Sequence, residues 1–159
     1  KLYDWLDDNL AVEFRRGAWV TDPCVIRQNS RMVSINTCLS VDLTGQVASE
    51  SIGPDQYSGT GGQTDTAVGA KEAYDGLGKS IIACRSTAKK GTLSAIVSTL
   101  APGTAVTLHR ANTDLIVTEF GIARLRGRTV RERAGALIAV AHPDFRAELA
   151  AQARKLGYL

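Results

Sequence analysis

Residues 32–50 read MVSINTCLSVDLTGQVASE, and this stretch decides the fold. Apolar and polar side chains alternate over Met32–Leu39, and the pattern continues through Val41–Leu43. Such alternation, rich in β-branched residues, predicts a β-strand with one buried face. Thr44-Gly45 predicts a turn, after which Gln46–Glu50 returns as a second strand. The sequence therefore predicts a β-hairpin here.

Further strands and helices are predicted on both sides of this hairpin. Residues 1–30 are expected to be irregular or helical, with a short helix starting at Asp22-Pro23, and the glycine-dense stretch 53–78 to hold little regular structure. Thr129 and Glu132 form a capping-box pattern that starts a helix, and a second helix starts at His142-Pro143-Asp144. Short strands are expected at Ser80–Cys84, Ser94–Leu100, Ala105–Leu108 and Leu115–Thr118. Strands mixed with helices predict a layered α/β domain.

The composition is that of a globular domain. The chain has 159 residues, of which 44% are hydrophobic and 22% charged, enough for one domain with its own core. Its formal net charge of +3 is too small to predict nucleic-acid binding, although 8 of the 19 basic and only 3 of the 16 acidic residues follow Glu119. No apolar run approaches the roughly 20 residues of a membrane span, so no membrane contact is expected. The chain opens on Lys1 without a secretory signal, so we expect residues 1–159 to be a single domain of something longer.

The cysteines and histidines do not predict a metal site. Cys24, Cys38 and Cys84 are odd in number and widely spaced, and His109 and His142 have no partner at ligand spacing. We therefore expect no structural metal, no disulfide framework and a reducing, cytoplasmic location. The three thiols are interpreted as buried and inert.

The most informative stretch for chemistry is Tyr57–Asp65, which reads YSGTGGQTD. Its glycines let the backbone approach a ligand closely, and successive N–H groups in such a loop can bind an anion or a developing oxyanion. No Gly-Lys-Ser/Thr follows, so it is not a P-loop, and no strand leads straight into it as in a dinucleotide-binding motif. A purely structural glycine loop is the alternative.

Two charged stretches are further candidates. Lys89 and Lys90 lie in a loop between predicted strands, where they would bind phosphates or form a solvated charge pair. Glu119 directly follows a predicted apolar strand, and open α/β sheets build their sites at such carboxyl ends. The alternative for Glu119 is a surface carboxylate, paired with Arg124 or Arg126.

Taken together in their order, these stretches make the chain resemble the C-terminal half of the acetyl-CoA hydrolase / CoA-transferase family. The likeness runs over nearly the whole chain. Its segments are Met32–Leu39, Val41–Gln46, Glu50–Gly53, Gln56–Asp65, Gly78–Ile82, Ser86–Thr92, Val117–Ala123, Leu125–Ala134 and Ala139–Phe145. The resemblance implies a three-layer, mixed-sheet α/β domain of the NagB/RpiA/CoA-transferase-like type.

The resemblance also implies a reaction. A glutamate attacks the thioester of acyl-CoA, and acyl-glutamyl and glutamyl-CoA intermediates pass CoA to a small carboxylic acid, or water hydrolyses the acyl group. Nothing in residues 1–159 matches the motif of that glutamate, so we expect it in an N-terminal domain of the same enzyme. CoA is then a substrate, no permanently bound cofactor is expected, and a homo-oligomer is expected.

Few site residues carry over from the family. Gly62 matches a glycine whose N–H forms part of the oxyanion hole, and Glu119 matches a second active-site carboxylate, so both are expected to be catalytic. Lys89 matches a lysine of the CoA cleft, and Asp22 stands where some members have an active-site Asn before Pro. The residues expected to bind substrate or CoA are thus Asp22, Gly61, Gln63, Lys89 and Lys90. Thr66 departs from the family, in which an aromatic residue is common at this place.

Two other classes of function stay open at this point. The first alternative is a non-catalytic module that binds CoA or a small ligand. The second is a dimerisation domain with its basic C-terminal part as the interface. CoA affinity without turnover would favour the first of these alternatives.

Overall fold

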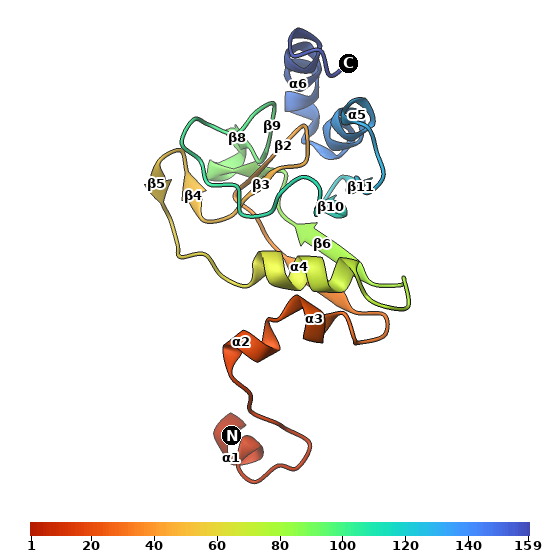
Figure 1. Ribbon diagram of the computed structural model, residues 1–159. Helices are drawn as coiled ribbons and strands as arrows, with labels where there is room; N and C mark the ends of the chain where they lie inside the picture. The colour runs from red at the N-terminus through yellow and green to blue at the C-terminus, as the bar shows by residue number, and fades with distance from the viewer.

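A four-stranded sheet organises the molecule in the computed structural model, which describes residues 1–159 (Figure 1). Its strand order is β1-β6-β10-β11, with β1, β6 and β10 parallel and β11 antiparallel to β10. The strands span Val33–Asn36 (β1), Lys79–Ala83 (β6), Leu115–Thr118 (β10) and Gly121–Arg124 (β11). The predicted strands at 80–84 and 115–118 are confirmed, the first shifted by one residue. The carboxyl ends of three parallel strands therefore meet at one edge.

The expectation that Val41–Leu43 continues the strand of residues 32–39 is wrong. The chain leaves the first sheet after Asn36 and enters a second, three-stranded sheet. That sheet has the order β3-β2-β9, formed by Val47–Ala48, Ser40–Asp42 and Ile96–Val97. The predicted hairpin at residues 41–47 is confirmed as the antiparallel pair β2 and β3.

A buried aspartate explains where this hairpin turns. Asp42 is 2% exposed, and its carboxylate accepts hydrogen bonds from the backbone N–H and side chain of both Thr44 and Gln46, at 2.7–3.0 Å. Gly45 lies between them with a φ of +94°, which glycine adopts without strain. The Asp-Leu-Thr-Gly-Gln pattern thus closes the turn and has a structural role.

The glycine-dense region contains a helix that the sequence analysis missed. Helix α4 spans Gln63–Lys71. Two of the glycines interpreted as loop residues serve close packing: a Cβ on Gly69 would lie 2.6 Å from the Cβ of Ile26, and one on Gly78 would lie 1.9 Å from the Ala70 carbonyl oxygen. Helix α3 (Pro23–Ile26) and strand β6 therefore approach α4 more closely than any side chain would allow.

The C-terminal helices follow their predicted starts. Helix α5 spans Val130–Val140 and begins with the complete capping box, and α6 spans Pro143–Lys155. Ala134, Leu137 and Leu149 point into the main core, which also takes in Ile82 and Ile116 of the sheet. The mixed α/β class predicted from the sequence is confirmed.

Both α4 and α5 cover the same face of the main sheet. Asn36 and Thr118 project to one side of the sheet, because the register pairs Asn36 with Ile82 and Ile82 with Ile116. The Asn36 side chain donates to Thr66 of α4, and the Thr118 hydroxyl donates to the carbonyl of Val140 in α5. On the opposite side of the sheet, Val33, Ile35 and Ile122 are 47%, 69% and 57% exposed. These three residues define what we call the open face.

The remaining strands are short. Leu93–Ser94 (β8) and Ile96–Val97 (β9) replace the single strand predicted at 94–100. Residues 105–108 form no strand and contribute only a bridge from Leu108 to Val47, so that prediction is wrong. The other short elements are β4 (Ser51–Ile52), β5 (Asp55–Gln56), β7 (Thr87–Ala88) and the 3₁₀ turn η1 (Lys89–Gly91).

The first twenty residues extend away from this body. Figure 1 shows α1 (Leu2–Leu6) apart from the sheets and connected to them through α2 (Gly17–Val20) and α3. Large apolar side chains in this segment are exposed, among them Tyr3 at 84%, Leu10 at 104% and Phe14 at 77%. No helix of the chain has the length and apolar character needed to span a bilayer.

Candidate functional site

The glycine loop ends at the start of a helix. Gly62 is the N-cap residue of α4, and its carbonyl accepts the N–H of Thr66 at 2.9 Å. No hydrogen bond within the chain uses the N–H groups of Gly61, Gly62 or Gln63. Free N–H groups at a helix N-terminus carry partial positive charge and can bind an anion or an oxyanion. The expectation of little regular structure in residues 53–78 is therefore wrong directly after the loop, where α4 begins.

Neighbouring elements hold this helix start in place. A Cβ on Gly62 would lie 3.3 Å from the Cγ2 of Thr21, so the segment before α3 packs against the loop. The Thr64 hydroxyl donates to the carbonyl of Thr107. The Asn36 amide donates to the Thr66 hydroxyl at 3.2 Å, which ties α4 to the carboxyl end of β1.

A polar hollow of about 230 Å³ lies in front of the loop. None of its lining residues is hydrophobic. They come from the end of β1, the segment after β3, the glycine loop and the region before residue 108. They are Asn36, Ser49, Glu50, Ser58, Gly59, Gly61, Gly62, Gln63 and Thr107.

Glu119 lies in a second hollow, of about 460 Å³, on the same sheet edge. This hollow is lined by Thr37, Ala83, Cys84, Arg85, Val117, Thr118 and Glu119, which follow or end β1, β6 and β10. Asn36 lines the first hollow and Thr37 the second, and the Ser49 hydroxyl donates to the Thr37 carbonyl at 3.1 Å. The structure thus brings Gly62 and Glu119 to adjoining hollows at the carboxyl ends of the parallel strands.

The Glu119 carboxylate is held by Ser86. The Ser86 N–H donates to Oε2 at 2.9 Å and its hydroxyl donates to Oε1 at 2.7 Å. These hydrogen bonds, that of the hydroxyl above all, lower the pKa of Glu119 below its ordinary value, so the group is a carboxylate at neutral pH. The proposed pairing with Arg124 or Arg126 is wrong. Neither arginine forms a salt bridge with Glu119, and Arg126 donates to the carbonyl of Lys71.

The lysines and Asp22 lie outside these two hollows. Lys89 and Lys90 are exposed in η1 and have φ values of +45° and +57°, which side-chain-bearing residues rarely adopt. Asp22 caps α3 by accepting the N–H of Cys24 at 2.8 Å. The structure gives Asp22 a local structural role, and it leaves both lysines exposed to solvent.

The cysteines differ from the expectation of three buried thiols. Cys24 is exposed, while Cys38 and Cys84 are half-buried and free. The thiols of Cys38 and Cys84 come after two neighbouring strands, β1 and β6, and a hydrogen bond joins them. This hydrogen bond raises the pKa of Cys38 and lowers the pKa of Cys84.

Sequence reasoning missed Ser86 and Glu50. Ser86 is completely buried, and the signal that could have found it is its place shortly after β6, the strand that pairs with β10, which Glu119 directly follows. Glu50 is 9% exposed, and its Oε2 has no hydrogen-bond partner. The Nε2 of Gln63, in the same hollow, is also buried without a partner.

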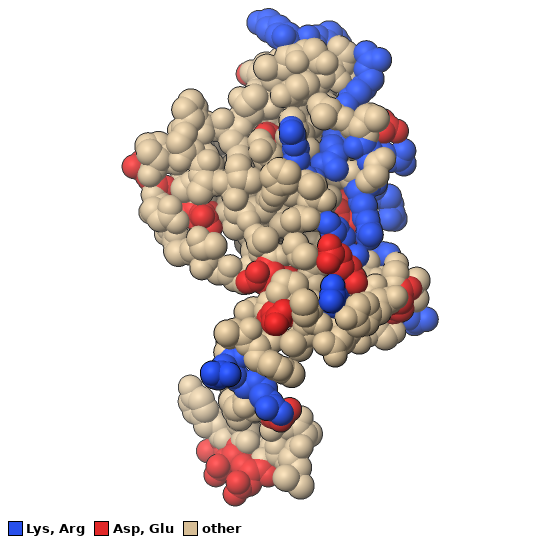
Figure 2. Space-filling model, in the orientation of Figure 1, with Lys and Arg blue, Asp and Glu red and all other residues tan.

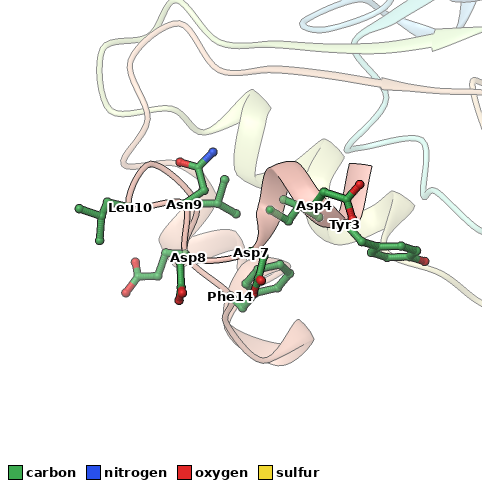
Figure 3. A pocket seen from close by; sticks show the side chains of 10 residues that line it. Tyr3, Asp4, Asp7, Asp8, Asn9, Leu10 and Phe14 are labelled. Atoms are coloured by element: carbon green, nitrogen blue, oxygen red, sulfur yellow. The ribbon is translucent and has the colours of Figure 1, made fainter. Parts of the chain in front are cut away.

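A larger hollow, of about 1190 Å³, lies within the N-terminal segment and has no features of an active site. It is lined only by residues between Tyr3 and Phe14. In Figure 3 the side chains of Tyr3 and Leu10 point in opposite directions instead of converging on a shared centre. No group of three or more His, Cys, Asp or Glu side chains is arranged to hold a metal ion.

Comparisons with known proteins find similar sequences over nearly the whole chain. The model of the acetyl-CoA hydrolase/transferase C-terminal domain matches residues 1–153. The chain is 49% identical over 156 residues to a succinyl-CoA:cyclohexane-1-carboxylate CoA transferase of Geobacter metallireducens, covering 98% of this chain and 35% of that protein. It is 50% identical over 155 residues to a 4-hydroxybutyrate coenzyme A transferase of Clostridium kluyveri, covering 98% and 36%.

A solved structure is similar over almost the whole chain. The crystal structure of RipA from Yersinia pestis superposes with a TM-score of 0.91 at 44% identity, covering 99% of this chain and 35% of that one. The chain thus spans about a third of the length of the relatives it matches.

Proposed function

We propose that this chain, which belongs to the acetyl-CoA hydrolase/transferase C-terminal domain family, works in an enzyme that transfers CoA between an acyl-CoA thioester and a small carboxylic acid, or hydrolyses acyl-CoA. The observation that carries the proposal is the glycine loop. Its free N–H groups at the start of α4 lie at the sheet edge that also holds an ionised carboxylate. This arrangement suits a reaction in which negative charge develops on a carbonyl oxygen.

Gly62 acts in the covalent steps by binding the oxyanion. A glutamate from the N-terminal domain attacks the thioester carbon, the C–S bond breaks, and an acyl-glutamyl anhydride and CoA thiolate result. The thiolate then attacks the glutamyl carbonyl, which gives glutamyl-CoA and releases the acyl group as a carboxylate. In each attack the carbonyl oxygen becomes negative, and the Gly62 N–H donates to it. Removing one such donor typically slows a reaction by about 10²–10³-fold.

Glu119 serves as a fixed negative charge and not as the nucleophile. Both of its oxygens are occupied by Ser86, which makes attack on a thioester unfavourable. Arg85 lines the same hollow and supplies a guanidinium for the carboxylate of the acceptor acid. Glu119 contributes a fixed negative charge to the same hollow.

The basic part of the molecule binds the phosphates of CoA. Lys89 and Lys90 are exposed in η1. Figure 2 shows further Lys and Arg side chains gathered over α5, α6 and the neighbouring strands, whereas acidic side chains gather on the N-terminal segment. Gly61 and Gln63 contact the thioester end of the same substrate, and Asp22 supports the loop from α3.

The partner of this chain is the N-terminal domain of the same enzyme. The open face and the apolar N-terminal segment give that domain an extensive apolar surface to cover. We place the enzyme in the cytoplasm, which suits its three free cysteines, and propose that it forms homo-oligomers. Light scattering of the complete enzyme tests the last point.

Thioester exchange tests the proposed function. The complete enzyme should move CoA from acetyl-CoA to a second acid, and borohydride trapping followed by mass spectrometry should find the adduct outside residues 1–159. The chain alone should be inactive, because it lacks the nucleophile. Turnover by the isolated chain would contradict the division of roles. CoA binding without turnover in the complete protein would instead favour a binding module.

A further inference from the structure

Two buried polar atoms in the hollow beside the glycine loop lack a partner. Oε2 of Glu50 is a hydrogen-bond acceptor, and Nε2 of Gln63 is a donor. Glu50 is more than nine-tenths buried, and both residues line the hollow of about 230 Å³. Buried polar groups are almost always hydrogen-bonded, so each exception requires an explanation.

The neighbouring polar groups of the hollow are already used within the protein. The Asn36 amide donates to Ser34 and to Thr66, and the Ser49 hydroxyl donates to the Thr37 carbonyl. The backbone of Glu50 is also fixed, since its carbonyl accepts the N–H groups of Tyr57 and Ser58 at 2.6 and 3.1 Å. Besides the free N–H groups of the glycine loop, the residues that line the hollow therefore leave one side-chain acceptor and one side-chain donor unpaired, and the backbone that carries the acceptor is fixed.

We propose that Glu50 and Gln63 bind a secondary amide of the substrate. The amide N–H donates to Oε2 of Glu50, and the amide carbonyl accepts from Nε2 of Gln63. A secondary amide offers one donor and one acceptor together. The inference rests on the proposed function, because it identifies this group as the amide of CoA nearest the thioester.

The position of Gln63 next to Gly62 fits this assignment. In CoA, two methylene groups separate the thioester sulfur from that amide nitrogen. Consecutive residues have Cα atoms about 3.8 Å apart. A thioester oxygen on the Gly62 N–H thus leaves the amide within reach of the next side chain. The pair would select thioesters of a pantetheine-like thiol over simple alkyl thioesters, since an unpaired buried polar site discriminates strongly against a ligand that cannot pair with it.

The direct test compares two thioesters in the complete enzyme. The acetyl thioester of N-acetylcysteamine carries the amide, and S-butyl thioacetate has a chain without it. Wild-type kcat/KM should favour the first by about tenfold or more, since one hydrogen bond to a charged group has roughly this effect. Glu50→Met and Gln63→Met should each lower the ratio of kcat/KM for the amide thioester to kcat/KM for the alkyl thioester by about tenfold, because each removes one partner of the amide. Glu50→Gln retains an acceptor oxygen and should keep most of the preference.

Two measurements keep the proposal testable without turnover. Calorimetry with pantetheine should show weaker binding in both Met variants, while binding of adenosine 3′,5′-bisphosphate stays unchanged. Thermal melting of Glu50→Met should show no loss of stability, because it removes an unsatisfied buried acceptor. Equal losses on both thioesters, unaltered pantetheine binding or a large drop in melting temperature would each overturn the amide site. A complete enzyme that binds pantetheine in this manner but exchanges no thioester would instead refute the proposed function alone.

Discussion

The charge of Glu119 depends on Ser86, which binds both of its carboxylate oxygens. Ser86→Ala removes the hydroxyl, the largest cause of the lowered pKa, so the pKa of Glu119 should rise toward its ordinary value. A carboxyl whose pKa is lowered in the folded state contributes stability at higher pH, and this contribution is lost as the pH falls through the folded pKa. Carbon-detected NMR titration of the Glu119 carboxyl in both proteins measures the shift. An unchanged midpoint would mean that Ser86 does not control the charge.

Glu119→Gln separates the charge from the shape of this group. The amide still accepts from Ser86 and the fold should survive, but the negative charge beside Arg85 is lost. In the complete enzyme we expect kcat to fall by about tenfold or more while the acyl-glutamyl adduct still forms. Mass spectrometry after borohydride trapping locates the adduct. Wild-type turnover would make Glu119 an ordinary surface carboxylate.

Lys89 should matter for CoA through its charge. Losing one charge-assisted hydrogen bond to a phosphate costs about 1.5–3 kcal/mol, so Lys89→Ala should weaken CoA binding by about tenfold or more. Lys79→Ala is the matched control. Lys79 is exposed at the amino-terminal end of β6, whereas Lys89 lies beyond the carboxyl end of this strand. Calorimetry on the complete enzyme gives both dissociation constants. Equal values for the two variants would remove Lys89 from the CoA site.

At the scale of elements, the packing of α4 against β6 depends on Gly78. A Cβ there would lie 1.9 Å from a backbone carbonyl oxygen, and backbone cannot move aside as a flexible side chain can. Gly78→Ala should therefore destabilise the protein by about 3 kcal/mol. Gly135→Ala, at an open position in α5, should be neutral or stabilising by up to about 1 kcal/mol. Urea unfolding followed by circular dichroism compares the two, and equal stabilities would contradict the close approach.

The same glycines explain which elements could be predicted. Helix α5 was recognised because its signal is local: Thr129 and Glu132 exchange hydrogen bonds three residues apart. Helix α4 was missed because Gly69 reads as a helix breaker, and only the neighbouring helix α3 reveals that it is needed for packing. In the candidate site, Gly62 and Glu119 were predicted from their patterns, and their roles stay predictions. Glu50 was not predicted, since the burial of one acidic side chain depends on segments far apart in the chain.

At the scale of the whole molecule, the open face predicts a difference between the isolated chain and the complete enzyme. Ile35→Ser and Ile122→Ser remove exposed apolar groups, so the chain alone should keep its stability within about 0.5 kcal/mol. In the complete enzyme the same residues should be buried, and their loss should cost about 2 kcal/mol each. Thermal denaturation of both forms measures the contrast. Equal effects would show that another surface holds the domains together.

The parallel arrangement of β1, β6 and β10 also has a consequence for the time course of folding. β6 lies between β1 and β10, and both of these partners lie far from it along the chain, since Val33 pairs with Lys79 and Leu115 with Ile81. Each pairing must close a long loop before it gains any contact, and such topologies fold slowly. By contrast, α5 and α6 follow one another directly and pack together. On the ribosome, the edge that carries Gly62 and Glu119 is therefore complete only after β10 has emerged.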